Sequence, residues 1–311
     1  MYTQTIVKEE IASVSVGICA TTELENTLRL TDQILDLNDR RIRIREILVA
    51  TPNRQLATDL SERDPRVAVL FEEKREGKAS ALNKIIRHAT GDILVLACAD
   101  IKIARNAIPR LVEDLVEHPQ WGAVDSIVEL VNGDKLLMDR VSNVLWETHN
   151  ATLDELDSQG RLGQIAGNLV AVRRELVEKL PNVINDDAYL ALSVQKKGFQ
   201  VKRAPGAQVW IGGPRTPTDY LYQRSRVLQG HLQLIRRFGK MPTTFEFQVL
   251  SKPQRYLRLL VKTVAKLGPS HLPPLIVAGF LEFLSLQVAI ISSLTRHGRK
   301  PWRIAETTKQ I

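Results

Sequence analysis

An isolated carboxylate follows directly on a strongly apolar stretch, GDILVLACAD, at residues 91–100. The β-branched and leucine-rich run from Ile93 to Leu96 is typical of a strand that is buried on both faces. Ligands of open α/β sheets bind beyond the carboxyl ends of the strands, so the position of Asp100 predicts a binding role. The alternative is a turn or N-cap aspartate that opens the helix expected after residue 103.

Alternating strands and helices make up the chain on both sides of this carboxylate. The predicted strands are 13–20, 45–51, 66–71 and 92–97, and the predicted helices are 26–38, 55–64, 78–90 and 104–118. This order predicts an α/β fold with a mainly parallel sheet and helices on both faces. The segment Cys19 to Glu23 then lies, like Asp100, beyond the carboxyl end of a strand.

A less regular part follows. It contains a predicted strand at 121–130, a long helix at about 135–157, a strand at 167–173, a helix at 186–198, strands at 200–204 and 207–211, and a helix at 219–239. The helix at 186–198 begins with two acids, Asp186 and Asp187, where the helix dipole favours negative charge. Capping of this helix is therefore one interpretation of the pair.

The net charge of the 311-residue chain is +8, from 43 Lys and Arg against 35 Asp and Glu. This balance indicates an anionic partner, which could be nucleic acid, nucleotide phosphates or an anionic membrane. Nucleic acid is disfavoured, because the basic residues concentrate near the end of the chain rather than along an aromatic-studded groove. The two cysteines, Cys19 and Cys98, indicate buried thiols in a reducing compartment. The polar start, Met1 to Glu10, predicts a cytoplasmic location.

The last sixty residues differ from the rest. At 251–268, four basic residues fall on one helical face, with an apolar side opposite: Arg255, Arg258, Lys262 and Lys266 against Tyr256, Leu259, Leu260, Val264 and Leu267. This pattern is typical of a helix on an anionic membrane surface. A 23-residue apolar segment, 272–294, follows with Glu282 as its one charge, and Arg296, Arg299 and Lys300 come next. It predicts membrane contact by spanning or partial insertion; a helix docked on the preceding domain is the alternative.

Four short stretches occur in a fixed order: VSVGICATTELEN, REGKASALNK with GDILVLACADI, INDDAYLALSVQKKGFQVKRAPGAQVW, and QRSRV. Together they resemble the family 2 inverting glycosyltransferases of the GT-A fold, including the cellulose and hyaluronan synthase branch, over about residues 13–235. The resemblance implies a GT-A domain at 1–240, with a donor-binding half at about 1–130 and an acceptor half at about 131–240. We expect residues 241–311 to form a membrane-associating helical region.

The resemblance also implies which residues bind the donor, a nucleotide-diphosphate sugar with uridine as the default base. The first-strand turn of the family ends in a glutamate, and only Glu23 of that turn is kept here, where Cys19, Ala20 and Thr21 precede it. The aspartate pair of the second strand is replaced by Thr51 and Pro52. Lys78, a point charge near the phosphates, and Asn83 match the family pattern, although Lys78 also fits a solvated helix start.

The Asp-x-Asp motif of the family is reduced here to Cys98-Ala99-Asp100. By resemblance, Asp100 is the ligand of a divalent ion, Mg²⁺ or Mn²⁺, that bridges the diphosphate; such hard cations favour oxygen ligands. Cys98 is better explained as a small buried filler.

The resemblance makes Asp187 the catalytic base, with Asp186 raising its pKa or orienting it. The stretch QRSRV matches the Gln-x-x-Arg-Trp motif except that Val227 replaces the tryptophan. It implies that Gln223, Arg224 and Arg226 bind diphosphate or acceptor, against the alternative of a solvated basic helix face. Without the tryptophan, processive polymer synthesis is disfavoured.

These observations predict a metal-dependent inverting glycosyltransferase at the cytoplasmic face of a membrane. Its acceptor would be a membrane lipid or lipid-linked molecule, in polysaccharide or glycolipid synthesis, and membrane proteins are possible partners. The alternative is a non-catalytic glycosyltransferase-like subunit that binds nucleotide or acts as a scaffold, as the missing acids at Thr51, Pro52 and Cys98 suggest.

Overall fold

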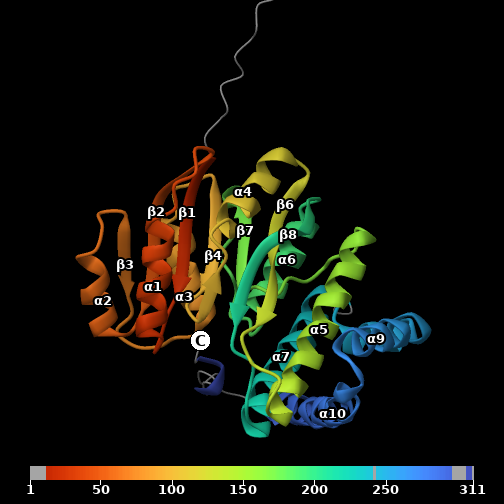
Figure 1. Cartoon of the computed structure of the whole chain (residues 1–311). Helices are drawn as coiled ribbons and strands as arrows, with labels where there is room; N and C mark the ends of the chain where they lie inside the picture. The colour runs from red at the N-terminus through yellow and green to blue at the C-terminus, as the bar shows by residue number, and fades with distance from the viewer. Residues whose placement is uncertain (1–11, 241–242, 296–305, 310–311) are drawn as a thin grey trace, which may run out of the picture.

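A single eight-stranded sheet organises the computed structural model, which describes residues 12–240, 243–295 and 306–309 (Figure 1). The strands lie in the order β3-β2-β1-β4-β7-β6-β8-β5. Their bounds are β1 Ala12–Cys19, β2 Ile42–Thr51, β3 Val67–Phe71, β4 Ile93–Cys98, β5 Ile101–Ile103, β6 Trp121–Leu130, β7 Leu169–Arg173 and β8 Gln200–Ile211. β7 runs antiparallel to β4 and β6, and β5 runs antiparallel to β8. The prediction of a mainly parallel sheet is confirmed, because the remaining pairs are parallel.

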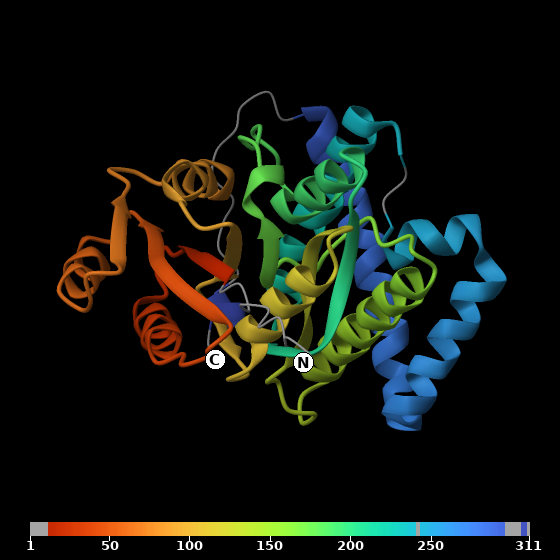
Figure 2. The same cartoon turned by 90° about the horizontal axis from the view of Figure 1, so that it is seen from above.

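Helices cover both faces of the sheet, as the alternating sequence predicts (Figure 2). One core layer lies under α1 (Leu24–Leu35), α2 (Arg54–Ser61) and α4 (Ala107–Glu117). The other lies under α3 (Lys78–His88), α6 (Asp186–Lys196) and the end of α5 (Leu137–Ser158). The two layers bury β4 on both sides, so its run of Ile93, Leu94 and Val95 is almost entirely shielded from solvent.

The structure corrects the sequence prediction at β8. Two strands were expected at 200–204 and 207–211, but one strand runs through Pro205 and Gly206. Its pairing with β6 shifts register between Asp125 and Ile127, so the extra residues bulge and the strand continues. The proline and glycine therefore mark a bulge rather than a strand end.

A further group of helices, which we call the helical layer, lies beneath the sheet, next to the carboxyl ends of the parallel strands (Figure 1). It is formed by α5, α7 (Pro217–Phe238), α8 (Phe245–Ser251), α9 (Pro253–Leu267) and α10 (Leu272–Thr295). α10 packs along α7 and α5, and α9 packs on α5 and α8. A 3-10 turn, Glu306–Lys309, lies below β4 in the same view. Arg296, Arg299 and Lys300, which the sequence places after the apolar segment, lie outside the described residues.

Glu282, the one charge in the apolar helix α10, is satisfied within the protein. Its carboxylate accepts hydrogen bonds from Arg224 Nε at 2.6 Å and Nη2 at 3.0 Å, and from the Tyr220 hydroxyl at 2.7 Å. Arg224 also pairs with Glu246 of α8. Because Arg224 and Glu282 are largely buried, this ion pair fixes α10 against α7 and α8.

Removing Glu282 should therefore loosen the helical layer. We expect Glu282→Ala to lower the free energy of unfolding by about 3 kcal/mol, because it leaves the Arg224 guanidinium buried with one carboxylate fewer. Chemical denaturation measures the change. The double variant Arg224→Met with Glu282→Leu should recover much of the loss, since it removes both charges. An unchanged denaturation midpoint in Glu282→Ala would show that the ion pair does not hold α10.

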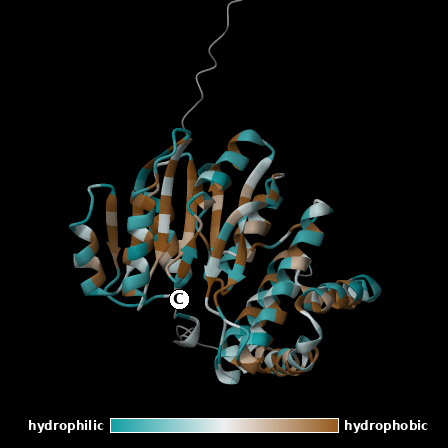
Figure 3. Cartoon of the chain, viewed as in Figure 1, coloured by the Kyte–Doolittle hydropathy of each residue, from teal (hydrophilic) through white to brown (hydrophobic). Residues whose placement is uncertain are grey.

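The segment Pro269–Thr295 is long and apolar enough to cross a membrane, and it is the one such segment among the described residues (Figure 3). One side of α10 is docked, and the other carries exposed apolar side chains; α8 and α9 carry further ones. We call this the apolar surface: Leu250, Leu257, Val261, Leu272, Ile276, Phe280, Phe283, Ile291 and Leu294.

The basic face predicted on α9 is only partly free. Arg255 pairs with Glu155, and Lys266 pairs with Glu147 at 2.7 Å, so both contact α5. Arg258 and Lys262 are exposed beside the apolar surface. Two of the four basic residues expected to face an anionic surface therefore serve to hold α9 in place.

Candidate active site

The fold brings the two key acids predicted from the sequence into one cavity. Asp100 follows β4, and Asp187 lies in the first turn of α6. Both line a cavity of about 520 Å³. Lys78 from the start of α3 and Gln223 and Arg226 from α7 line it too. The expected donor-side and acceptor-side residues therefore share one space.

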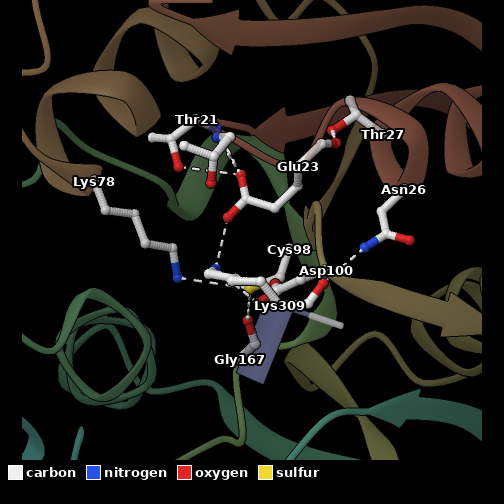
Figure 4. Close-up of polar contacts among 10 residues, drawn as sticks. Thr21, Glu23, Asn26, Thr27, Lys78, Cys98, Asp100, Gly167 and Lys309 are labelled. Carbon is white, nitrogen blue, oxygen red and sulfur yellow. Dashed lines mark hydrogen bonds and ion pairs between the residues drawn. The ribbon is translucent and has the colours of Figure 1, made fainter. Parts of the chain in front are cut away.

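The turn after β1 is built around Glu23, which is buried. Its Oε2 accepts hydrogen bonds from the Thr21 amide at 2.7 Å, the Thr22 amide at 2.9 Å and the Thr21 hydroxyl at 3.1 Å. Its Oε1 lies 2.7 Å from Lys309 Nζ, which also lies 2.7 Å from Asp100 Oδ2 (Figure 4). Burial alone would raise the pKa of Glu23, but the Lys309 charge and these hydrogen bonds lower it to about 2.

The acidic pair of α6 is divided into two roles. Asp186 is buried and pairs with Lys78, Nζ to Oδ2 at 2.9 Å. Asp187 lines the cavity, and its Oδ1 accepts a hydrogen bond from the Ala188 amide at 2.6 Å. Burial and then the neighbouring Asp186 charge raise the pKa of Asp187 to about 6, against the charges of Lys78 and Arg226. A carboxylate with such a pKa is ionised at neutral pH and can still take a proton, as a general base must.

Asp125 positions the loop opposite Asp187, a role that the sequence did not reveal. Its Oδ2 accepts a hydrogen bond from the Ala166 amide at 2.6 Å, and the Gly167 amide lies 3.4 Å from Oδ1. Burial raises the pKa of Asp125 to about 7, although Arg203 and these amides oppose the shift. The loop is also tied to β4, because the Cys98 amide donates to the Asn168 carbonyl at 2.9 Å. The feature of the sequence that could have revealed this role is an acidic residue, Asp125, in the middle of the buried strand β6.

Gly167 gives Asp187 the room that it needs. Its φ of +74° lies in the left-handed region, and a Cβ at this position would lie 2.5 Å from the Asp187 Cβ. Two independent constraints therefore require glycine here: backbone conformation and close approach.

We expect Gly167→Ala to reduce sugar transfer by about 100-fold, since displacement of a reacting group by about 1 Å has an effect of that size. Steady-state kinetics measures the loss, and nucleotide binding should change little. Gly160→Ala is the matched control, because Gly160 also has a left-handed φ, +63°, but nothing lies within 4 Å of a Cβ there. Equal activity of the two variants would contradict the proposed contact with Asp187.

Three residues expected to bind ligand have other partners. Thr51 is fully buried, and its hydroxyl accepts a hydrogen bond from the Asn53 amide at 3.1 Å. Asn83 bonds the Leu180 carbonyl at 2.8 Å and the Leu180 amide at 2.7 Å, so its amide group holds a loop. Arg224 is committed to Glu282 and Glu246. These contacts give the three side chains structural roles, and their predicted binding of ligand stays a prediction.

Cys19 and Ala20 lie at the carboxyl end of β1, where the donor is expected to bind. Ala20 is buried, and its amide bonds the Ala50 carbonyl at 3.0 Å, so it shapes the turn. Burial raises the pKa of the Cys19 thiol, and burial likewise raises that of Cys98. Both cysteines are therefore neutral thiols. Each is half-buried, and Cys98 lines the cavity rather than only filling space in the core.

The carboxylates of Asp100 and Glu23 fit a divalent cation. They converge on one point, where each has an oxygen 2.7 Å from the same ammonium nitrogen. Mg²⁺ and related ions are commonly held by one or two carboxylates together with substrate phosphate oxygens. No cluster of three or more histidine, cysteine or acidic side chains that could hold a metal occurs within the described part of the chain. Bound phosphate would therefore have to complete the coordination.

Comparison with protein families matches residues 15–181 to the model described as Glycosyl transferase family 2, which is more than half of the chain. The chain belongs to glycosyl transferase family 2. A second model, Glycosyl transferase family group 2, matches residues 125–295 and so extends over the helical layer. The family resemblance predicted from the four sequence stretches is confirmed.

Two curated relatives illustrate what this family 2 chain is similar to. A probable glycosyltransferase YdaM of Bacillus subtilis is 27% identical over 172 residues, covering 52% of this chain and 40% of the relative. A poly-beta-1,6-N-acetyl-D-glucosamine synthase of Staphylococcus aureus is 24% identical over 199 residues, covering 62% and 48%. This chain thus matches less than half the length of either relative.

Solved structures confirm the GT-A fold. The mannosyltransferase PcManGT of Pyrobaculum calidifontis, in complex with GDP-Man and Mn²⁺, superposes with a TM-score of 0.62 at 21% identity, covering 93% of this chain and 89% of that one. Mannosyl-3-phosphoglycerate synthase from Rubrobacter xylanophilus superposes with a TM-score of 0.54 at 16% identity, covering 74% and 76%. At these identities the likeness is one of fold.

Proposed function

We propose that the protein is an inverting, divalent-metal-dependent glycosyltransferase that moves a sugar from a nucleotide-diphosphate sugar to a lipid-linked or membrane-proximal acceptor. One observation carries the proposal: Asp100 and Asp187 line the same cavity, and that cavity continues between apolar helices. The expected site is the cytoplasmic face of a membrane, and the expected process is polysaccharide or glycolipid synthesis.

The donor would lie on the β1 and β4 side of the cavity. Asp100 and Glu23 would hold Mg²⁺ or Mn²⁺, which when bound stabilises the negative charge of the leaving nucleoside diphosphate. Lys78 and Arg226 line the same cavity as Asp100 and Asp187, where they can attract phosphate oxygens. No carboxylate forms an ion pair with Arg226 among the described residues, so its guanidinium is available for an anion. UDP-sugars are the default donors, and GDP-mannose is the alternative that the PcManGT complex suggests.

The acceptor would approach Asp187 from the helical layer. Direct displacement with inversion needs a base on the face of the sugar opposite the leaving group. Asp187 lines the same cavity as Asp100, and its raised pKa suits that role. An acceptor hydroxyl next to Asp187 would lose its proton to the carboxylate as it attacks the anomeric carbon.

The apolar part of the cavity supports a lipid-linked acceptor. Its walls beyond Arg226 come from α8 and α10, with Phe245, Val249, Leu275, Phe283 and Leu286 among them. Leu275, Phe283 and Leu286 belong to the same helix as much of the apolar surface. A lipid chain could therefore leave the cavity directly into a membrane that contacts this surface.

Adjacent basic residues support an anionic acceptor or head group. A second cavity, of about 940 Å³, is lined by five arginines or lysines besides Lys78: Arg75, Lys179, Arg226, Arg236 and Arg237. Lys78 and Arg226 line both cavities, so a phosphate group bound here would be close to the reacting centre. The +8 charge of the chain is consistent with this arrangement.

Transfer assays test the proposal. Labelled UDP- and GDP-sugars are incubated with the protein, Mn²⁺ and a polyprenyl phosphate or glycolipid acceptor in mixed micelles. We expect metal-dependent product with at least one donor, and we expect binding to anionic vesicles that weakens when Phe280 and Ile276 are both replaced by serine. Nucleotide binding without turnover of any donor would instead favour the non-catalytic subunit.

A further inference from the structure

The 306–309 turn forms part of the cavity wall near Asp100. Its Thr308 lines the cavity, and its Lys309 ammonium lies between Glu23 and Asp100 (Figure 4). The turn is fastened at three further points. Asn26 donates to the Lys309 carbonyl at 3.1 Å, the Thr307 hydroxyl donates to Asp219 at 2.6 Å, and the Arg215 amide donates to that hydroxyl at 3.1 Å.

Lys309 occupies the point where the proposed metal would bind. Each carboxylate presents to its ammonium an oxygen that a divalent ion would use as a ligand. Nothing in the sequence predicted this contact, because Lys309 and Asp100 are 209 residues apart. An ammonium and a metal ion cannot occupy the same position, so the two must compete.

Charge favours the metal once a diphosphate is present. One ammonium against two carboxylates leaves a net negative charge, which repels the diphosphate of a donor. A divalent ion neutralises both carboxylates and also bonds phosphate oxygens. Lys309 is therefore the favoured cation when no donor is bound, and the metal is favoured when a donor is bound.

We propose that the 306–309 turn is an internal plug, in which Lys309 occupies the Glu23–Asp100 cation site until a divalent metal and a nucleoside diphosphate displace it. The proposal rests on the metal site of the proposed function. Displacement also moves Thr308 out of the cavity, so the turn opens the donor side at the same time. The alternative, in which Lys309 stays in place and replaces the metal in catalysis, predicts that Mn²⁺ and nucleotide leave the hydrogen exchange of residues 307–309 unchanged in the parent protein.

Metal affinity tests the plug without any assay of sugar transfer. Mn²⁺ binding in the presence of UDP, and separately GDP, is measured by electron paramagnetic resonance for the parent protein, Lys309→Gln and Thr307→Val. We expect Lys309→Gln to bind Mn²⁺ about tenfold more tightly or better. In the parent protein, only the fraction of molecules in which Lys309 has left the site can bind Mn²⁺, and the apparent affinity is lowered by that fraction. Thr307→Val keeps the ammonium and removes the hydroxyl bond to Asp219, so it should shift affinity in the same direction by less.

Lys196→Gln is the matched control, because Lys196 is exposed on α6 and the substitution removes the same charge. Hydrogen exchange of the amides at 307–309 provides a second measurement, and it should rise in the parent protein when Mn²⁺ and the nucleotide are added together. Weaker or equal Mn²⁺ binding by Lys309→Gln, with exchange unchanged in the parent, overturns the plug but leaves the metal site intact. If no form of the protein binds Mn²⁺, the metal dependence of the proposed function fails, and the plug fails with it.

Discussion

Asp187→Asn is expected to reduce sugar transfer by about 1,000-fold or more while leaving donor binding nearly unchanged. General-base catalysis contributes about 10²–10⁴-fold, and an asparagine amide cannot take the proton of the acceptor hydroxyl. The substitution keeps the size of the side chain, so the close contact with Gly167 is preserved. The Lys78–Asp186 ion pair next to it remains as well.

The pH dependence gives an independent test of the same residue. Because the pKa of Asp187 is raised to about 6, the base is ionised above that value and protonated below it. Transfer should therefore fall about tenfold per pH unit below about pH 6. Between the unfolded and folded pKa values, the folded protein holds a proton that the unfolded chain has released, so its stability falls as pH rises through this window. Asp187→Asn should remove this contribution and should be no less stable than the parent at pH 7.

Initial rates at saturating donor, measured from pH 5 to pH 8, check both expectations. Asp59→Asn is the control, because Asp59 lies on α2, away from the cavity. Thermal unfolding shows whether each variant is folded. A fully active Asp187→Asn variant would remove Asp187 as the base and leave the pair with Asp186 as helix-capping acids.

Asp100→Ala is expected to abolish tight Mn²⁺ binding and to lower kcat/KM by about 100-fold or more. Asp100 is the surviving acid of its motif, and loss of it leaves Glu23 as the one carboxylate at the cation site within the described residues. A single carboxylate holds a divalent ion poorly unless phosphate adds further ligands. The defect should therefore appear at low Mn²⁺ and be partly overcome at high concentration.

Titration of activity with Mn²⁺ separates this variant from Asp187→Asn, whose metal dependence should match that of the parent. Glu23→Gln serves as a comparison, because Glu23 Oε2 also holds the Thr21 and Thr22 amides, so this variant should also disturb the turn. Parent-like activity of Asp100→Ala at every Mn²⁺ concentration would show that the cation site does not take part in the reaction.

The fold was largely predictable because it depends on local patterns. The runs around Val16, Leu48 and Leu94 are continuous enough to be assigned as buried strands, and their order with helices predicts a parallel sheet. The short strand β5 and the bulge in β8 were missed, since three residues carry no pattern and a Pro-Gly pair resembles a strand end. α8, which is seven residues long, was missed for a similar reason.

The positions of the candidate site residues were predictable where a side chain lies close to its own motif. Asp100, Asp187 and Lys78 lie where the motifs imply, because strand ends and helix starts are fixed by the fold. Arg224 and Asn83 are also polar residues of the motifs. Their side chains, however, contact Glu282 and Leu180, which are distant in sequence.

The sequence by itself therefore determined the fold class, the family and the edge of the sheet at which chemistry takes place, because these follow from short-range periodicity and motif order. Only the tertiary structure decided which polar groups are free for a ligand. That depends on long-range ion pairs, such as Arg224 with Glu282 and Lys309 with Asp100, in which the partners are brought together by packing of the helical layer on the sheet. A charged side chain that already faces an opposite charge within the protein has to exchange that partner before it can bind a ligand.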